Sequence, residues 1–154
     1  MPTCTFLVGI PASGKSTWVK KHAKFEVVLS TDDLLEDFAT LENITYNDAF
    51  TKYMPRADKM FHDILDSCAR TGDDVIIDRT NLSKKSRKRL MEKFKDKGYV
   101  FKAVVFPVPN QEELSTRLAS RPGKTIPQKV MWSMISNFQH PTVDEGFSEV
   151  AVYA

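Results

Sequence analysis

The sequence predicts an α/β fold with a mainly parallel central sheet of four to five strands, flanked by helices. Short apolar runs alternate along the chain with longer stretches whose apolar residues recur at helical spacing, as in strand–helix–strand units. A glycine-rich loop, Gly9–Thr17, lies between the first apolar run and the first helical stretch. With 154 residues, of which 42% are hydrophobic, the chain suits a single domain over residues 1–154.

The first half of the chain is expected to contain three strands and three helices. The strands are the short apolar runs at Thr3–Val8, Glu26–Leu29 and Val75–Ile77. The helices are expected at Ser16–Lys24, at Thr31–Phe38 and over a long periodic run from Phe50 to Cys68. Pro55 has no amide hydrogen, so it must kink this run or start a new helix. The intervening residues 39–47 are polar, and we expect them to be irregular.

The second half continues the alternation. Ser83 is expected to cap a strongly basic helix that ends at Gly98. Asn110, with Glu113 three residues later, resembles a capping arrangement for the next helix, which Pro122 and the following glycine end. The remaining elements are expected to be strands at Val100–Phe106 and Phe147–Tyr153 and a helix at Pro127–Asn137.

Several features bear on the cellular compartment. No apolar run approaches transmembrane length. Met1 leads almost directly into the first strand, which leaves no room for a signal peptide. Cys4 and Cys68 occupy apolar positions outside any metal or redox motif, so we interpret them as buried free thiols. These features predict a cytoplasmic protein, of a bacterial host if the chain is phage-encoded, with no membrane partner.

Charge is unevenly distributed, although the net charge is only +2. Residues 30–78 contain twelve acidic and four basic side chains, whereas residues 79–129 contain fourteen basic and four acidic ones. The asymmetry suggests a basic face that could meet a polyanion. Its densest part is a basic cluster formed by Lys84, Lys85, Arg87, Lys88 and Arg89. This cluster could track a phosphate backbone, with an attraction that weakens in salt, or it could be a solvated helix face.

The loop Gly9–Thr17 matches G-x-x-x-x-G-K-[ST], the phosphate-binding motif of nucleoside-triphosphate enzymes. Backbone amides of such a loop wrap around a triphosphate, and the N-terminus of the following helix adds its dipole. The residues expected to bind ATP, or another nucleoside triphosphate, are Gly9, Ala12, Ser13, Gly14, Lys15, Ser16 and Thr17. Lys15 can reach the β- and γ-phosphates, and the Ser16 hydroxyl can ligate Mg²⁺.

Acidic residues follow the second and third predicted strands, where reactive groups gather in open α/β folds. Asp78 could support Mg²⁺ directly or through water, or it could cap a turn. Asp32 and Asp33 lie in a first helical turn, where a carboxylate can stabilise the helix dipole without doing chemistry. One of the two could instead accept the proton of an attacking hydroxyl.

Arg117 and Arg121 lie four residues apart near the end of the helix before Pro122. On one helical face beside a flexible Pro-Gly segment, they could close over the triphosphate as an arginine-bearing lid. They would then stabilise charge on the transferring phosphoryl group. A solvated pair of arginines has the same spacing. We expect both arginines to be catalytic, and Arg121 also to bind the nucleotide.

With these segments assembled, the chain resembles the polynucleotide 5′-hydroxyl kinase family, the kinase module of phage, bacterial and animal end-healing enzymes. GIPASGKSTW resembles the family's nucleotide loop, LSTDD its general-base segment, IIDRTN its D-x-T-N stretch, RLASR its lid and HPTVDEGFSEV its C-terminal segment. The resemblance covers nearly the whole chain. It implies an adenylate-kinase-like P-loop NTPase fold, with ATP and Mg²⁺ serving transfer of the γ-phosphate to a 5′-OH end of DNA or RNA.

The resemblance also assigns roles to residues. It maps the general base onto Asp32 and the lid arginines onto Arg117 and Arg121. The nucleic acid is expected to contact Asp32, Asp78, Arg79, Thr80 and Asn81, with residues 39–47 and 79–89 lining the acceptor side. Some family members grip the acceptor's phosphate with an arginine three residues beyond the general base. Leu35 occupies that position here, so Arg79 or the basic cluster is the expected substitute. The phosphatase motif D-x-D-G-[TV] of two-domain relatives does not occur, so 3′-phosphatase activity is not expected.

Two other functions use the same donor machinery. A small-molecule kinase would phosphorylate a nucleoside, nucleotide or sugar, and it would lack a salt-sensitive affinity for oligonucleotides. A nucleotide-dependent switch would bind ATP without transferring phosphate. Asp32 beside a complete phosphate loop favours transfer over the switch.

Overall fold

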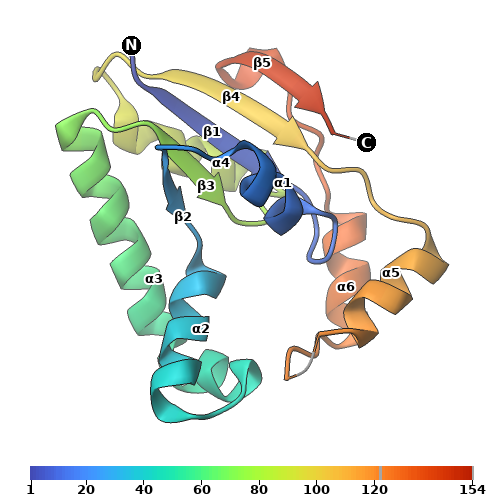
Figure 1. Ribbon diagram of the computed structural model, residues 1–154. Coiled ribbons are helices and arrows are strands. Elements are labelled where there is room, and N and C mark those ends of the chain that lie inside the picture. Colours follow the sequence, from blue (N-terminus) through green and yellow to red (C-terminus); the bar gives the residue numbers. More distant parts are fainter. Residues whose placement is uncertain (122, 154) are drawn as a thin grey trace.

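The computed structural model describes residues 1–121 and 123–153. Within these residues the centre is a sheet of five parallel strands in the order β2-β3-β1-β4-β5 (Figure 1). The strands are β1 (Thr3–Val8), β2 (Val27–Leu29), β3 (Val75–Asp78), β4 (Val100–Val105) and β5 (Phe147–Val152). The predicted parallel α/β architecture is thereby confirmed.

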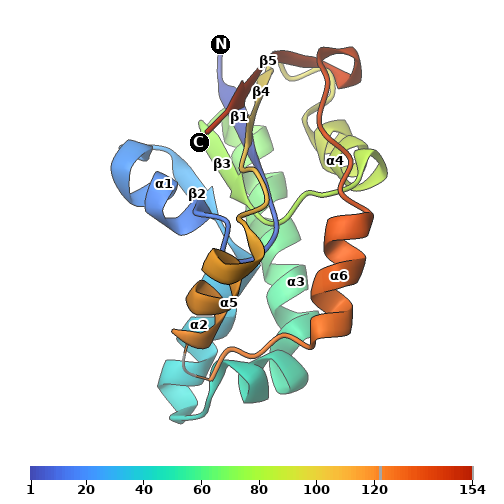
Figure 2. The ribbon, with the colours of Figure 1, turned by 90° about the vertical axis from the view of Figure 1, so that its right-hand side faces the viewer.

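Helices surround this sheet and extend beyond the C-terminal ends of its strands. They are α1 (Lys15–His22), α2 (Thr31–Glu42), α3 (Tyr46–Thr71), α4 (Lys84–Met91), α5 (Gln111–Ala119) and α6 (Gln128–Ser136), with short 3-10 helices η1 (Glu92–Phe94) and η2 (Val143–Glu145). Figure 2 shows α1 and α4 on opposite sides of the sheet, and α2, α5 and α6 below the strand ends. None of the helices within the described ranges combines the length and apolar composition needed to cross a membrane.

Apolar side chains pack on both faces of the sheet and at its C-terminal edge. The largest cluster includes Phe61 of α3 on one face, and a second joins Trp18 of α1 to the other. A third cluster brings Ile10 of the glycine-rich loop together with Leu114 of α5 and Met131 of α6. The glycine-rich loop is therefore anchored through Ile10, which packs against α5 and α6.

Residues 39–47, expected to be irregular, are mostly helical. α2 continues to Glu42, and Asn43 ends it in the left-handed conformation, with a φ of 56°. Thr45 then caps α3, because its side chain accepts the Asp48 amide hydrogen at 3.1 Å. The polar side chains that suggested a loop, such as Thr40 and Glu42, lie on the solvent-facing side of α2. Ala39 lies on the buried side of the same helix.

Two other helices differ from or refine the prediction. Pro55 lies inside the continuous helix α3, so it does not start a new one. Figure 1 shows the axis of this helix turning between its first turns and the long remainder. The basic helix α4 ends at Met91, well before Gly98. It ends there because η1 then carries Phe94 into the core, where that ring is 1% exposed.

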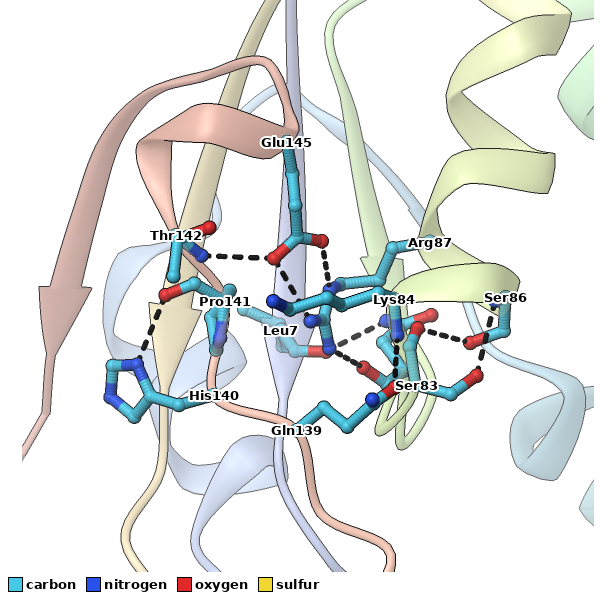
Figure 3. Close-up of polar contacts among 11 residues, drawn as sticks. Leu7, Ser83, Lys84, Ser86, Arg87, Gln139, His140, Pro141, Thr142 and Glu145 are labelled. Atoms are coloured by element: carbon cyan, nitrogen blue, oxygen red, sulfur yellow. Dashed lines mark hydrogen bonds and ion pairs between the residues drawn. The ribbon is translucent and has the colours of Figure 1, made fainter.

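Arg87, assigned by the sequence to the basic cluster, is fully buried (Figure 3). Its Nε and Nη2 donate to the two carboxylate oxygens of Glu145 at 2.8 and 3.1 Å, and its Nη1 donates to the Asn81 carbonyl at 2.7 Å. Although burial opposes the charge of Glu145, hydrogen bonds from Arg87 and from the Thr142 amide hold its pKa below the usual value. Arg87 is therefore not available to bind a phosphate backbone as predicted. It connects α4 to η2 in the C-terminal segment instead.

Replacing Arg87 by alanine is expected to lower the free energy of unfolding by about 3–5 kcal/mol, because Glu145 would lose its counterion and keep only the hydrogen bond from the Thr142 amide. Urea denaturation followed by circular dichroism measures this loss. Lys88→Ala, at the exposed neighbour on the same helix, is the matched control and should cost less than about 0.5 kcal/mol. Equal losses for the two variants would mean that the ion pair does not hold the C-terminal segment in place.

Candidate active site

The loop Gly9–Thr17 connects β1 to α1, and packing and backbone geometry require two of its glycines. A Cβ atom on Gly9 would lie 2.6 Å from Ser13 Oγ and 2.9 Å from Phe106 Cβ, so no side chain fits there. Gly14 precedes α1 with a φ of 109°, which side chains rarely adopt. The Gly9 amide donates to the Thr80 carbonyl at 3.0 Å. This bond fixes the start of the loop against the end of β3.

Lys15 begins α1 and turns back over the loop. Its ammonium group donates to the carbonyl oxygens of Gly9 and Ile10 at 2.7 and 3.1 Å. Burial lowers the pKa of Lys15 to about 8, and the nearby carboxylates of Asp78 and Asp32 oppose this shift. A desolvated ammonium group gains from an anion placed beside it. Lys15 is therefore suited to a phosphate.

Other groups around the loop also suit a phosphate. Ser13 Oγ and Arg121 Nη1 are buried and have no hydrogen-bond partner within the described residues. Ala12 holds a positive φ of 65°, and Ser16 and Thr17 are exposed in the first turn of α1, at the positive end of its dipole. The residues expected to bind ATP thus lie together in one loop, here called the phosphate cradle, whose donors are of the kind that phosphates require. Nucleotide binding by this loop stays a prediction.

Asp32 and Asp78, predicted at two different strand ends, both lie near enough to Lys15 to raise its pKa. Burial raises the pKa of Asp78 to about 6; Lys15 opposes this rise, and Asp33 and Asp32 add to it. Burial also raises the pKa of Asp33, with Glu36 and Asp32 contributing in the same direction. These mutual effects show that the carboxylates and the ammonium group lie within electrostatic range of one another.

Ser16 and Asp78 are the expected Mg²⁺ ligands. In residues 1–121 and 123–153, no group of three or more His, Cys, Asp or Glu side chains has the arrangement of a metal site. Phosphotransferases usually hold Mg²⁺ with one or two protein groups, while substrate phosphates and waters complete its shell. One hydroxyl and one carboxylate beside the phosphate cradle fit that donor set, and their role stays a prediction.

Tyr46, which the sequence analysis did not single out, contacts the predicted general base. Its hydroxyl, at the first residue of α3, donates to Asp32 Oδ1 at 2.5 Å. Asp32 itself is fixed in the first turn of α2, which Ser30 caps by accepting the Asp33 amide hydrogen at 3.2 Å. No sequence motif links Tyr46 to Asp32. The short turn between α2 and α3 brings them together, and that turn was not predicted.

Arg117 contacts the glycine-rich loop directly, whereas Arg121 lies near enough to Lys15 to lower its pKa. α5 ends at Ala119, so Arg121 lies beyond the helix rather than on its face as predicted. Arg117 Nη1 donates to the Ala12 carbonyl at 2.9 Å, and the same guanidinium group pairs with Glu113. Arg117 therefore pins the loop to α5. Arg121 acts electrostatically on Lys15 and keeps one buried nitrogen without a partner in the described part of the chain.

Residues 123–125, which follow the predicted lid arginines and are here called the lid segment, contact the start of α3. The Asn47 amide donates to the carbonyl of residue 123 at 3.0 Å, and its side chain exchanges two hydrogen bonds with Thr125. The Lys124 ammonium group lies 4.6 Å from the centre of the Tyr46 ring. The lid thus rests on the same helical turn that contacts Asp32.

Thr80 and Asn81 support the backbone of the site. Thr80 provides the carbonyl that accepts the Gly9 amide. Asn81 is 5% exposed, and its side-chain amide donates to the carbonyls of Leu7 at 2.7 Å and Ile77 at 3.3 Å. These bonds join the C-terminal ends of β1 and β3. The Asn81 side chain therefore holds two strands together, although the sequence suggested contact with a substrate.

The Arg79 side chain is partly exposed, with 31% of its surface accessible. Its guanidinium group lies 4.7 Å from the centre of the Phe61 ring and 3.7 Å from the Asp58 carboxylate. A hollow of about 230 Å³ adjoins it between α3, the end of β3 and α4, and Arg89 and His62 also line this hollow. Two guanidinium groups from different elements thus border one cavity next to the site.

The likeness to known proteins agrees with this geometry. A family model described as AAA domain matches residues 5–141, which contain the loop, both acidic strand ends and the lid. The chain belongs to the AAA domain family. It is also similar to human heterogeneous nuclear ribonucleoprotein U-like protein 2, with 26% identity over 156 residues, covering 94% of this chain and 20% of that protein. The chain therefore spans about a fifth of the length of the curated relatives it matches.

Solved structures share the fold of this family member. A structure of the PezAT toxin–antitoxin system of Streptococcus pneumoniae superposes with a TM-score of 0.70 and 16% identity, covering 99% of this chain and 67% of that chain. At such identity the likeness concerns the fold alone. A chain in the Pnkp1/Rnl/Hen1 RNA repair complex has a TM-score of 0.64 and 26% identity, covering 96% of this chain and 46% of that chain. The predicted α/β P-loop NTPase fold is confirmed.

Proposed function

We propose that the chain is an ATP-dependent polynucleotide 5′-hydroxyl kinase, which transfers the γ-phosphate of ATP to the 5′-OH end of DNA or RNA. The observation that carries the proposal is that Asp32, bonded to Tyr46 in the first turn of α2, lies within electrostatic range of Lys15 and Asp78. Transfer to a hydroxyl needs a carboxylate at this place, whereas a nucleotide switch does not. The likeness to a chain of an RNA repair complex, and the motifs of the resembled family, support a nucleic-acid acceptor.

In this proposal the residues divide between donor and acceptor. The loop amides and Lys15 hold the β- and γ-phosphates, while Asp32 orients the acceptor hydroxyl and takes its proton as the new O–P bond forms. Arg121 stabilises charge that develops on the transferring group. Bound Mg²⁺, held by Ser16 and Asp78, would neutralise part of the phosphate charge.

The acceptor strand is proposed to lie along two hollows. One, of about 610 Å³, is lined by the end of α2, the start of α3 and lid residues 123–124. The other is the hollow of about 230 Å³ that Arg79 and Arg89 border. Leu35 is fully buried and cannot contact a strand. We infer that Arg79 and Arg89 take the acceptor's phosphate instead.

Arg89→Ala is expected to raise the KM for a 5′-OH oligonucleotide roughly tenfold, the usual size of a charge-assisted contact. The KM for ATP should not change, and the slope of log affinity against log salt should fall by about one. Lys88→Ala is the matched control, since this exposed neighbour does not line the hollow. An unchanged salt slope in Arg89→Ala would remove this residue from the acceptor site.

One assay tests the proposal as a whole. The protein is incubated with γ-labelled ATP and Mg²⁺ while 5′-OH DNA, 5′-OH RNA, nucleosides, 3′-mononucleotides and gluconate are offered side by side. Label on the 5′ ends of oligonucleotides, absent with Lys15→Ala protein, is the expected result. Label only on a small molecule would favour the small-molecule kinase. Bound ATP with no labelled product would favour the switch.

A further inference from the structure

Tyr46 makes the one side-chain hydrogen bond that the structure gives Asp32 within the described residues. The donated proton goes to Oδ1 at 2.5 Å, which leaves Oδ2 for another partner. Burial, together with the hydrogen bond to Asp32, raises the pKa of Tyr46 far above its usual value. The hydroxyl therefore stays protonated at neutral pH and serves as a permanent donor.

We propose that Tyr46 is a positioning residue, which holds one oxygen of Asp32 so that the other meets the acceptor hydroxyl. The inference rests on the proposed function. A general base must present its free oxygen within hydrogen-bond reach of the proton it takes, and rotation of the carboxylate would lose that alignment. A neutral donor on one oxygen restricts this rotation while the carboxylate remains able to accept a proton on the other.

The lid segment contacts Tyr46 and the residue next to it in α3. Lys124 lies over the Tyr46 ring and pairs with Glu36 of α2. The next residue, Asn47, is bonded to lid residues 123 and 125 through its backbone and its side chain. The first turn of α3 therefore contacts both the lid segment and Asp32. The same helical turn, the start of α3, therefore binds the lid segment through Asn47 and Asp32 through Tyr46.

The chain contains a matched control for this contact. Tyr53, further along α3, also donates its hydroxyl to a carboxylate of α2, that of Glu42. Its ring stacks on Phe38 with a centroid distance of 4.5 Å. Glu42 lies at the end of α2 remote from Asp32. Tyr53→Phe thus removes the same atom and the same kind of bond between the same two helices, away from the site.

The kinetic test compares Tyr46→Phe with Tyr53→Phe in the labelled-ATP assay. Tyr46→Phe is expected to lower kcat about tenfold or more, with the KM for ATP within about twofold of wild type, because only alignment of the base is lost. Tyr53→Phe should keep wild-type kcat. A purely structural role would lower the thermal midpoint of both variants and leave kcat per folded molecule unchanged, and that result would overturn the inference.

A second readout does not depend on the acceptor. The ¹³Cγ resonance of Asp32, assigned by its loss in Asp32→Asn, should move in Tyr46→Phe and stay in place in Tyr53→Phe. An unmoved resonance overturns the inference even if wild type phosphorylates 5′-OH ends. If wild type transfers no phosphate to any acceptor, the proposed function fails and the catalytic part of the inference fails with it. The resonance then still reports whether the hydroxyl holds the carboxylate.

Discussion

Asp32→Ala is expected to reduce transfer to a 5′-OH oligonucleotide by roughly 10²–10⁴-fold, the range that loss of a general base produces. Asp32 lies beside the phosphate cradle, close enough to Lys15 and Asp78 to act on the pKa of each. Without it, the attacking hydroxyl must lose its proton to water and is no longer oriented. The measurement is kcat under saturating ATP and acceptor, with ATP affinity determined separately by calorimetry.

Asp33→Ala is the matched control for this prediction. Asp33 lies in the same first turn of α2, and its side chain is exposed, with Glu36 and Asp32 nearby. It should affect helix stability slightly, through the dipole, and leave most of the turnover intact. Near-normal turnover in Asp32→Ala, with a large loss in Asp33→Ala, would mean that the base had been assigned to the wrong one of the two.

Arg121→Ala is expected to lower kcat by about 10³-fold or more, the usual effect of an arginine that stabilises the transferring phosphoryl group. Its Nη1 is buried without a hydrogen-bond partner in the described residues, so this nitrogen is available for a new charge that develops during transfer. Affinity for ATP should fall much less than kcat, because the interaction strengthens only as that charge forms. Steady-state kinetics with direct ATP binding separates the two quantities.

Arg121→Lys adds a further discrimination. It keeps the charge but loses the planar fork, so it should recover only part of the lost turnover. Lys129→Ala changes an exposed cation near the start of α6 and should leave kcat unchanged. If Arg121→Ala weakened ATP binding and left kcat intact, Arg121 would be a clamp on the nucleotide and not a group that acts on the transition state.

The parts of the fold and the site that could be predicted from sequence depend on local patterns. Gly9, Gly14 and Lys15 follow a fixed spacing, because the Lys15 ammonium group must turn back to reach the carbonyl oxygens of Gly9 and Ile10 in the same loop. The acidic strand ends could be placed together because parallel strands present their C-terminal ends at one edge of the sheet. Strands β1, β3 and β4 could be predicted from their apolar runs, because helices cover both faces of a parallel sheet and its strands are therefore apolar on both sides.

What could not be predicted depends on partners that are distant in sequence. Arg87 lies in a run of lysines and arginines that reads as an exposed face, and only its pairing with Glu145, 58 residues away, explains its burial. The contact of Tyr46 with Asp32 requires the turn after Asn43, whose polar residues suggested a loop. Asn81 matched a family motif, but its bonds to the strand backbone follow from the way β1 and β3 pair.

The ion pair between Arg87 and Glu145 also limits how far the chain can be shortened at its C-terminal end without loss of stability. The family match stops at residue 141, yet the acidic partner and the whole of β5 come later. A graft of residues 5–141 into another protein would leave the buried Arg87 guanidinium group without its counterion and would uncover the edge of β4. A transplantable version must therefore run through Val152, so that the piece carries its own counterion and its own closing strand.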